Sequence, residues 1–576
     1  MKTYQELKRA CKRDPSDFPL VKLAILGDCA TQLLSTAIRG SGIEAGLNLQ
    51  VLDTDYNQIR RQVIDSNSEL YCFAPEYILI QMCTEKLYER YCDTPMQRRE
   101  QFSEDVVDEI RQIWKQITAN SGARILQYNF VLMCDAVFGN YGTKVKDSFR
   151  YQLQKLNLLL MDLAAETQNA FILDLASIQT AMGNRLFFDE KYYYSAKTPL
   201  SLAALPYAAK AVLDTILALR GKLKKCVILD LDNTLWGGVI GDDGMAKIQI
   251  GELGTGHAFT DVQLWLRELR RRGIILAVCS KNNEDTAKEP FEKHPDMILR
   301  LEDISIFVAN WEDKVSNIRY IQQTLNLGMD SMVFIDDNPF ERNMVNALIP
   351  DITVPELPQD PAQYLRYLQN LNLFETASYS EEDQQRTKQY QAEINRSNMQ
   401  QQFNCIDDYL ESLEMNAQVH NFDEFHCPRI AQLTQRSNQF NLRTVRYTEE
   451  DIQRIANDPN YMTAYFTLKD KFGDYGLISV VIFEKRDGDT LFIDTWLMSC
   501  RVLKRGMEEF IVDRMMQIAR NNGYKKVVGE YLKTPKNAMV EDIYEKMGFV
   551  RLDKNHFIGS TDLYQDHKTH IKEELA

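Results

Sequence analysis

Short apolar runs alternate with amphipathic segments in the first part of the chain. Four runs are typical of buried strands, at residues 22–27, 76–81, 124–130 and 170–175. Helical periodicity lies between them, for example at 104–118 and 149–166, and a further helix is expected at 201–220, before Gly221. Strands that alternate with helices predict a parallel sheet covered on both faces. We therefore predict a first domain of three-layer α/β type at residues 1–220.

The same alternation starts again after Gly221. A strand is expected at CVILD, from Cys226 to Asp230, and two more at 274–279 and 332–336. Helical segments separate them, which again favours a parallel sheet with helices on both faces. This pattern predicts a second α/β domain at residues 221–370.

The remainder of the chain has a different pattern. A very polar stretch at 378–402 predicts a connector at residues 371–404. Its composition is compatible with an exposed helix and also with disorder. In the last part, 405–576, strands expected at 477–483 and 490–497 flank Asp487-Gly488-Asp489, a hairpin signal. A helix is expected at 506–521. The fold class is therefore α/β multidomain.

Composition narrows the functional classes. The net charge of −15 argues against a nucleic-acid partner, because neutralising phosphates needs clustered Lys and Arg. No apolar run of 18 residues predicts a membrane span, and the polar N-terminal segment does not resemble a signal peptide. Eleven scattered cysteines form no C-x-x-C pair, so neither a zinc site nor a disulfide framework is predicted. We expect a cytoplasmic protein with reduced thiols.

Two acidic residues follow directly after the first strand of the second domain. The segment VILDLDNTLWGG places Asp230 and Asp232 where an apolar strand ends. Ligands of open parallel sheets bind at the carboxyl ends of strands. Paired carboxylates there form a hard oxygen site that suits Mg²⁺. The sequence therefore predicts a magnesium site at this strand end.

Three later elements make this prediction more specific. Strand 274–279 leads into Ser280, Lys314 precedes an expected helix, and strand 332–335 leads into Asp336 and Asp337. The order D-x-D-x-T, S, K, DD resembles the haloacid dehalogenase (HAD) superfamily over about 140 residues. A solvated acidic loop is the alternative for the Asp pair taken alone, because exposed carboxylates are the norm.

The HAD resemblance implies a role for each residue. Asp230 is the nucleophile that forms an aspartyl-phosphate, and Asp232 protonates the leaving oxygen and then activates water. Lys314 offsets the negative charge of the transition state, and Ser280 orients the phosphoryl group. The implied substrate-binding residues include Thr234, Ser280, Lys281 and Asn338, and the implied magnesium ligands are Asp230, Asp232 (through its carbonyl), Asp336 and Asp337.

The spacing of these motifs leaves no room for a large cap domain. Only 45 residues separate Thr234 from Ser280, and only 21 separate Lys314 from Asp336. Each interval holds about one helix plus loops. An uncapped site accepts a large substrate, including one carried on a protein, and excludes water less well.

Longer segments resemble the FkbH-like proteins, whose phosphatase domain belongs to HAD subfamily IIIC. The matching segments are LDLDNTLWGGVIGDDG, CSKNN, FIDDNPFER, TQRSNQFNLRT, LKDKFGDYGLIS and WLMSCRVLKRG, which span most of residues 220–550. The resemblance implies removal of phosphate from a substrate such as 1,3-bisphosphoglycerate. It also implies transfer of the glyceryl group to the thiol of an acyl carrier protein.

The last domain is similar to GNAT acyltransferases. NAMVEDIYEKMGF resembles the last helix of that fold, with Tyr544 at the position of a thiol-protonating tyrosine. The loop from Arg501 to Gly506 resembles a pyrophosphate loop, so the resemblance implies a phosphopantetheine or CoA thiol as cofactor. Lys504 stands in place of the first glycine of the loop, which disfavours CoA, whereas its charge suits a phosphopantetheine phosphate. Cys500 lies beside Arg501 and is a candidate acyl carrier. An inert thiol is the alternative.

The start of the first domain resembles the SGNH hydrolases. LGDCATQ places Cys29 at the nucleophile position, and Asn129 and Asp189 are weak candidates for later motifs. All seven histidines lie at residue 257 or later, so this domain cannot supply a histidine base to Cys29. We therefore expect a degenerate SGNH-like domain that binds or scaffolds, with retained activity as the alternative.

Three functions remain open at this point. The first is magnesium-dependent dephosphorylation of a small acyl phosphate or phosphorylated three-carbon acid, coupled to acyl transfer. The second is a simple phosphatase with two binding domains. The third is a non-catalytic scaffold, against which the complete four-part motif argues.

Overall fold

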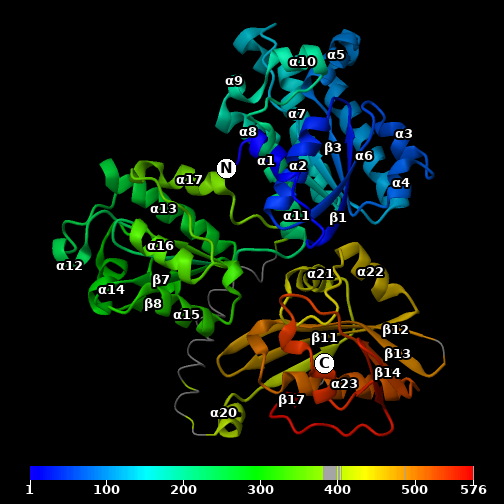
Figure 1. Ribbon diagram of the computed structural model, residues 1–576, viewed down its shortest axis with the longest axis vertical. Helices are drawn as coiled ribbons and strands as arrows, with labels where there is room; N and C mark the ends of the chain where they lie inside the picture. Colours follow the sequence, from blue (N-terminus) through cyan, green and yellow to red (C-terminus); the bar gives the residue numbers. More distant parts are fainter. Residues whose placement is uncertain (380–398, 400–402, 404, 487, 575–576) are drawn as a thin grey trace. The chain divides into compact units, whose positions relative to one another are not determined.

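The chain divides into two compact units, Met1–Ile216 and Leu217–Ala576. A computed structural model (Figure 1) describes residues 1–379, 399, 403, 405–486 and 488–574 of the chain. The first division falls close to the boundary predicted at residue 220. The connector predicted at 371–404 lies mostly outside the described residues, and so does Asp487 of the predicted hairpin turn.

The first unit is built on a five-stranded parallel sheet. Its strand order is β2-β1-β3-β4-β5, and every neighbouring pair is parallel. The strands are β1 (Leu20–Gly27), β2 (Asn48–Asp53), β3 (Tyr77–Gln81), β4 (Arg124–Tyr128) and β5 (Ala170–Leu173). This order confirms the predicted parallel α/β sheet. Only β2, an edge strand with a half-exposed pattern, was not predicted.

Amphipathic helices cover this sheet. Helices α6 (Phe102–Asn120) and α7 (Phe149–Glu166) pack their apolar positions against β1, β3 and β4 in one buried cluster. The predicted helix at 149–166 has the observed bounds. The other helices are α1 (Tyr4–Ala10), α2 (Gln32–Glu44), α3 (Ile59–Ile64), α4 (Glu69–Phe73), α5 (Thr84–Asp93), α8 (Leu175–Met182), α9 (Asn184–Phe187), α10 (Glu190–Ala196) and α11 (Leu205–Leu219).

The second unit begins with a four-stranded parallel sheet of order β8-β7-β6-β9. Its strands are β6 (Cys226–Leu229), β7 (Ile275–Ser280), β8 (Ile304–Ala309) and β9 (Met332–Ile335). All positions of β6, β7 and β9 are buried, as expected for strands covered on both faces. The edge strand β8 was not predicted.

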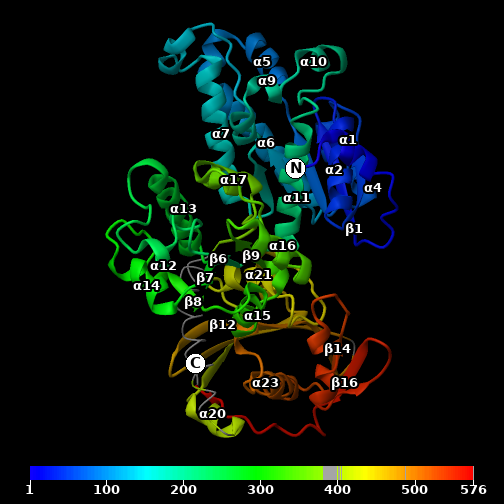
Figure 2. The ribbon, with the colours of Figure 1, turned by 60° about the vertical axis from the view of Figure 1, so that its left-hand side comes forward.

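Helices on opposite faces cover this sheet (Figure 2). Helices α13 (Gly254–Arg271) and α14 (Glu284–Lys293) pack on one face, and α15 (Lys314–Leu325) and α16 (Pro339–Leu348) pack on the other. The interval between Thr234 and Ser280 holds α13 and the short α12 (Ile240–Asp243). Among these described residues no separate domain is inserted, which agrees with the prediction that a large cap is lacking. Helix α17 (Tyr364–Leu371) follows.

An eight-stranded mixed sheet forms the rest of the second unit, in the order β15-β16-β14-β13-β12-β11-β10-β17. The strands are β10 (Asn416–His420), β11 (Tyr461–Asp470), β12 (Gly473–Lys485), β13 (Thr490–Met498), β14 (Lys526–Glu530), β15 (Val550–Arg551), β16 (His556–Ser560) and β17 (Lys572–Glu573). Its helices include α20 (Ile406–Ser412), α21 (Cys427–Arg436), α22 (Glu449–Asn457), α23 (Met507–Asn521) and α24 (Ile543–Lys546).

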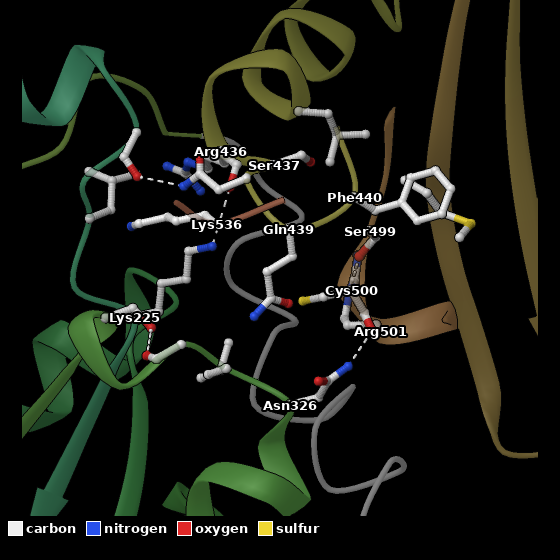
Figure 3. Close-up of a pocket in the computed structure, with 18 of the residues that line it drawn as sticks. Lys225, Asn326, Arg436, Ser437, Gln439, Phe440, Ser499, Cys500, Arg501 and Lys536 are labelled. Atoms are coloured by element: carbon white, nitrogen blue, oxygen red, sulfur yellow. Dashed lines mark hydrogen bonds between the residues drawn. The ribbon is translucent and has the colours of Figure 1, made fainter. Parts of the chain in front are cut away.

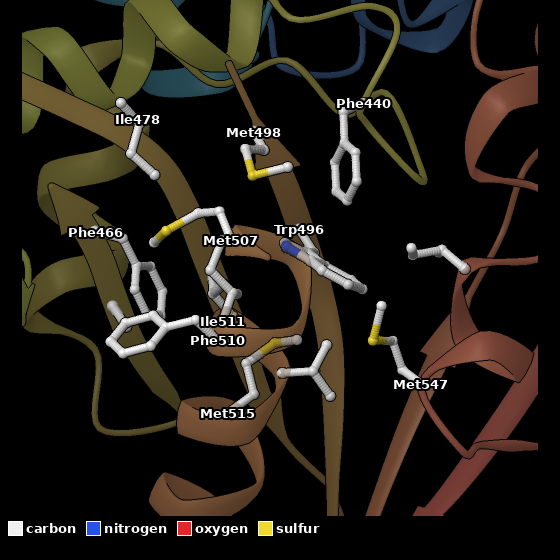
Figure 4. Packing of buried hydrophobic residues seen from close by; sticks show 14 of the residues in the cluster. Phe440, Phe466, Ile478, Trp496, Met498, Met507, Phe510, Ile511, Met515 and Met547 are labelled. Carbon is white, nitrogen blue, oxygen red and sulfur yellow. The ribbon is translucent and has the colours of Figure 1, made fainter. Parts of the chain in front are cut away.

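Helix α23 supplies one side of the core beneath this sheet. Its buried Met507, Phe510, Ile511 and Met515 pack against strand residues that include Trp496 (Figure 4). Burying such side chains stabilises the fold by roughly 1.5–3 kcal/mol for each one. The predicted helix at 506–521 and the predicted strands around it are therefore confirmed.

Membrane-spanning helices were not expected. Among the described residues, no helix combines the length and apolar character needed to cross a bilayer.

Candidate functional site

Strand pairing brings the predicted acidic residues together. Strand β6 lies beside β9, and the backbone N–H of Asp230, just past β6, donates to Ile335 O at 3.0 Å. Asp336 follows Ile335 directly. Ser280 ends β7, the other neighbour of β6, and is buried. The carboxyl ends of three adjacent strands therefore meet where the sequence predicted a site.

Lys314 joins the two key carboxylates. It is the first residue of α15, which is capped by the side chain of Asp313. Its ammonium Nζ lies 2.9 Å from Asp230 Oδ1 and 2.5 Å from Asp336 Oδ2. Because Lys314 is only 3% exposed, these contacts are largely shielded from solvent.

Burial controls the protonation of this cluster. It raises the pKa of Asp230 to about 6, with repulsion from Asp336 adding to the effect and Lys314 opposing it. Burial also raises the pKa of Asp336 and of Asp337. Burial alone would lower the pKa of Lys314, but the carboxylates of Asp230 and Asp336 raise it, so the lysine is charged.

Three carboxylates are placed to hold a divalent cation. One oxygen from each of Asp230, Asp336 and Asp337 lies within 4.8 Å of the others. Three carboxylates and one ammonium leave a formal charge of about −2 when all are ionised, which a divalent cation offsets. The donor set consists of oxygen atoms, the type that Mg²⁺ prefers. These residues fit Mg²⁺.

A second layer of hydrogen bonds fixes the acidic loop after β9. Thr234 Oγ1 accepts from the Asp337 backbone N–H at 3.1 Å. The buried Arg342 donates to the backbone carbonyls of Asp336 and Asp337 at 2.8 and 2.6 Å. Since both carbonyls are tied down, the two carboxylates are held toward Asp230.

The carboxylate of Asp232 is held away from the cation-binding group. Its Oδ1 accepts from Trp236 Nε1 at 2.9 Å and from the Ile240 backbone N–H at 3.0 Å. Its Oδ2 accepts from Asn282 Nδ2 at 2.8 Å. Both oxygens of the Asp232 carboxylate therefore have hydrogen-bond donors, and this carboxylate is outside the group formed by Asp230, Asp336 and Asp337. Proton transfer by its side chain and metal ligation by its backbone carbonyl stay predictions.

The sequence reasoning missed Asn282. This residue is 4% exposed and donates to Ser280 Oγ at 3.3 Å as well as to Asp232. It therefore couples the proposed acid to the proposed phosphoryl-orienting serine. Its place in CSKNN, two residues after the motif serine, was the available signal.

Two predicted substrate-binding residues have other partners. Lys281 Nζ donates to Glu341 Oε1 at 2.7 Å, so its charge is directed at the start of α16. The Oδ1 of Asn338 accepts from the Phe340 backbone N–H at 2.9 Å and caps α16. Both side chains contact helix α16 in this structure, and their substrate-binding roles stay predictions.

Cys500 lies in a second place, a basic pocket of about 320 Å³ (Figure 3). Its side chain points toward Gln439, and its backbone carbonyl accepts from Asn326 Nδ2 at 2.9 Å. Lysine and arginine side chains line the pocket, namely Lys225, Arg429, Arg436, Arg501 and Lys536. The predicted Arg501 thus faces the same space as the thiol.

The predicted thiol-protonating role of Tyr544 does not fit its position. Tyr544 is 1% exposed, and its ring packs against Trp496, Phe549 and Phe557. Its buried hydroxyl has no hydrogen-bond partner among the described residues. Burial raises the pKa of this hydroxyl far above its usual range. We therefore correct the assignment and place Tyr544 in the core.

The loop before α23 keeps a left-handed backbone despite its lysine. Lys504 has φ 60° and Gly506 has φ 81°. The Lys504 backbone N–H donates to Glu508 Oε1 at 2.9 Å. The Glu508 carboxylate thus accepts from a backbone N–H that a bound pyrophosphate group would need as a donor. This hydrogen bond disfavours CoA at the loop.

The SGNH-like candidates of the first unit contact other groups of that unit. Cys29 is 1% exposed, and a hydrogen bond with Cys83, together with burial, raises its pKa well above that of a free thiol. Asn129 donates to Asp174 Oδ1 at 2.7 Å, and Asp189 caps α10. A buried thiol is a poor nucleophile, and the loss of hydrolase activity in this unit stays a prediction.

Comparisons with known proteins agree with the central site. Residues 22–217 match the family model described as FkbH, N-terminal domain. The N-terminal part of BF1531 from Bacteroides fragilis contains a phosphatase domain and was crystallised with Mg. It is 51% identical, and the match covers 66% of this chain and 100% of that one at a TM-score of 0.64. No curated protein matches the sequence.

Two acetyltransferase structures resemble part of the chain. The ribosomal-protein-S18-alanine N-acetyltransferase of Escherichia coli is 12% identical, and the match covers 25% of this chain and 90% of that one at a TM-score of 0.20. Mutant forms of the spermidine/spermine N-acetyltransferase SpeG of Vibrio cholerae are 12% identical, with 26% and 96% covered at a TM-score of 0.21. Likenesses this low support no functional assignment.

Proposed function

The chain belongs to the FkbH-like family and contains a HAD-type phosphatase domain, and from this premise we propose that it dephosphorylates a small phosphorylated acid in a magnesium-dependent reaction and passes an acyl group to a carrier-protein thiol. One observation carries the phosphatase part. Lys314 Nζ lies within ion-pair distance of both Asp230 and Asp336, beside the oxygen cluster completed by Asp337.

The geometry supports an aspartyl-phosphate route. An oxygen of Asp230 forms a bond to phosphorus while the bond to the leaving oxygen breaks, and Asp232 gives that oxygen a proton. Water then loses a proton to Asp232 and attacks phosphorus, which frees Asp230 and releases phosphate. Bound Mg²⁺ supplies charge neutralisation between the two anions, and Lys314 adds to it.

The surroundings of the site favour a substrate with a large carrier. Trp311 and Phe340 are 71% and 70% exposed, and they flank Lys314 and Asp336 in the chain. Large exposed aromatic residues are enriched in surfaces that bind other proteins. Together with the lack of a large cap, they support access by a protein-borne phosphorylated group.

Phosphate release tests the phosphatase part. We expect Mg²⁺-dependent release from a panel of phosphorylated three-carbon acids that carry no acyl phosphate, reduced to background by Asp230→Asn. The matched control is Asp351→Asn, because Asp351 is an exposed carboxylate in the same part of the chain. Release that survives Asp230→Asn, or that does not depend on Mg²⁺, would contradict the proposal and favour a scaffold role.

The proposed acyl transfer belongs to a separate location. Lys225 and Ser331, which line the Cys500 pocket, directly precede β6 and β9, whereas Asp230 and Asp336 directly follow these strands. A strand of four residues spans roughly 13 Å. One three-carbon substrate therefore cannot reach both places at once. We infer two successive reactions rather than one concerted transfer.

The Cys500 pocket supports the acyl-transfer reaction. Its basic lining suits an acyl phosphate, whose phosphate group is the leaving group. The Cys500 thiolate attacks the acyl carbon, a thioester forms, and the bond to phosphate breaks. The thiol of a carrier protein's phosphopantetheine arm then takes the acyl group, since the loop at Lys504 disfavours CoA.

An adduct experiment distinguishes transfer from simple phosphatase activity. We expect intact-protein mass spectrometry with 1,3-bisphosphoglycerate to detect an acyl adduct that Cys500→Ser removes and Asp230→Asn retains. Cys405→Ser is the matched control, because Cys405 is an exposed thiol in the same unit. If no adduct forms, or if Cys500→Ser retains it, the acyl-transfer part fails and a simple phosphatase remains.

A further inference from the structure

The first unit has its own place for a ligand, distinct from the phosphatase site. Strand β1 pairs with β2 on one side and with β3 on the other, so the strand order reverses between β1 and β3. Open parallel sheets bind ligands outside the carboxyl ends of strands at such a point. The backbone N–H of Asp28 donates to Gln81 O at 3.1 Å, so the loops after β1 and β3 lie side by side there.

Two thiols and a carboxylate meet at this point. Asp28 and Cys29 follow β1, and Cys83 follows β3. The two sulfur atoms and one carboxylate oxygen all lie within 4.8 Å of one another. The Cys83 backbone N–H donates to Asp28 Oδ1 at 2.9 Å, which fixes that carboxylate beside the thiols. Cys29 is 1% exposed and Cys83 is 4% exposed.

A cavity leads to this cluster from outside. A pocket of about 410 Å³ is lined by Asp28 and Cys83, together with Asn57, Lys86 and other residues of the first unit. Cys29 lies behind them and does not line the pocket. The cluster therefore has two ligand atoms at the wall of a cavity and one further inside, with an entry path from solvent.

The charge of the cluster suits a divalent cation. Two thiolates and one carboxylate carry a charge of −3, which a divalent ion lowers to about −1. Lys86 also lines this pocket and adds one positive charge beside the cluster.

We propose that Asp28, Cys29 and Cys83 bind a zinc ion whose fourth position faces this pocket. Thiolate ligands select Zn²⁺ over Mg²⁺. Three protein ligands with one open position are the arrangement of zinc sites that bind a further molecule. The first unit then has a metal-dependent binding role, which does not depend on the phosphatase or acyl-transfer chemistry of the second unit.

Two other roles for these residues are the remnant of a nucleophile site and a disulfide pair. The nucleophile reading lacks a base, because no histidine occurs before residue 257. A disulfide would join Cys29 to Cys83 and leave the Asp28 carboxylate without a cation. A metal site uses all three side chains, and Co²⁺ titration of the reduced chain distinguishes it from a disulfide.

Cobalt titration of the full, reduced chain tests the zinc site. Bound to thiolates, Co²⁺ gives an intense sulfur-to-metal charge-transfer band, whereas the site at Asp230 offers only carboxylate oxygens and gives none. We expect one equivalent of Co²⁺ to develop the band in the wild-type protein and one equivalent of Zn²⁺ to remove it. No band in the reduced wild-type protein would overturn the proposal, whatever the variants do.

Variants locate the sulfur ligands. Cys29→Ser and Cys83→Ser should each lose the band, and Asp28→Asn should weaken Co²⁺ binding by about 10-fold or more. Cys72→Ser is the matched control, because Cys72 is an exposed thiol of the same unit, and it should keep the full band. A band that persists in both Cys29→Ser and Cys83→Ser, or a Cys29–Cys83 disulfide that excludes Co²⁺ even after reductant is added, would overturn the proposal.

Discussion

Lys314 Nζ lies 2.9 Å from Asp230 Oδ1, so the proposed nucleophile is ion-paired. The same ammonium also contacts Asp336. Because these groups are almost fully buried, water cannot replace the lysine as the partner of either carboxylate. We therefore expect Lys314 to contribute to the stability of the site without metal and to catalysis.

Lys314→Met should destabilise the metal-free protein. Removing one partner of a buried ion pair leaves uncompensated charge, which costs about 3–5 kcal/mol. Mg²⁺ should restore more stability to this variant than to the wild type, since the cation then offsets the carboxylates alone. Denaturant unfolding in EDTA and in Mg²⁺ measures both effects.

Lys288→Met is the control for that measurement. Lys288 forms an exposed pair with Glu284 on α14, so its loss should change the free energy of unfolding by less than about 1 kcal/mol. Equal stability losses in the two variants, or a Mg²⁺ effect no larger in Lys314→Met than in the wild type, would contradict the assigned role.

The stabilisation by Mg²⁺ should increase with pH. The pKa of Asp230 is about 6 in the folded protein and near 3.8 when unperturbed, so the folded state holds this proton more tightly. Its ionisation therefore reduces the stability of the metal-free protein as pH rises from about 4 to about 6. Mg²⁺ favours the ionised carboxylate and removes that loss.

Unfolding free energies with Mg²⁺ and with EDTA, measured across this pH range, check the expectation. The difference between them should grow up to about pH 6 and then level off. The raised pKa values of Asp336 and Asp337 act in the same direction. Asp230→Asn should flatten the profile, and a difference that is independent of pH in the wild type would contradict the role of these carboxylates.

Asn282→Ala should lower kcat more than it raises KM. Asn282 donates to Asp232 Oδ2 at 2.8 Å and to Ser280 Oγ at 3.3 Å, so its loss leaves the acid and the serine less well positioned. We expect a fall in kcat of about 10–100-fold, the size typical of groups that orient ligands. Asn282→Asp should be worse, because it places a second carboxylate against Asp232.

Asn283→Ala provides the neighbouring control. Asn283 is exposed and accepts from Trp311 Nε1, away from Asp232. Its kcat should stay near that of the wild type. Steady-state kinetics with one phosphorylated substrate measures kcat and KM for both variants. If the two alanine variants are equally active, Asn282 has no positioning role.

The phosphatase site could be predicted because its signals are local. Asp230, Ser280 and Asp336 each end or follow an apolar strand, and the parallel sheet then brings strand ends together. Roles that depend on side-chain direction could not be predicted. Lys281 has the charge expected of a phosphate ligand but pairs with Glu341, whereas the neutral Asn282 reaches the site.

Long-range pairing produced the largest departure from the sequence reasoning. Cys29 and Cys83 lie far apart in the chain and form no C-x-x-C motif, so the sequence does not indicate that they meet. Only the pairing of β1 with β3 places them together. Likewise, the Tyr544 motif predicted a catalytic group, but close packing against Gly529 and Trp496 places this ring in the core.

Tyr544→Phe tests that core position directly. The Tyr544 hydroxyl is buried without a hydrogen-bond partner among the described residues. Its burial costs desolvation free energy that no hydrogen bond offsets, so removing the hydroxyl should stabilise the folded state. We expect the free energy of unfolding to rise by about 1 kcal/mol and acyl transfer to be unchanged. Tyr531→Phe is the control, because the buried Tyr531 hydroxyl contacts Asn537 Oδ1 at 3.3 Å and its loss should cost about 1 kcal/mol. If Tyr544→Phe instead loses stability or abolishes transfer, the hydroxyl has a partner or a role that its packed position does not provide.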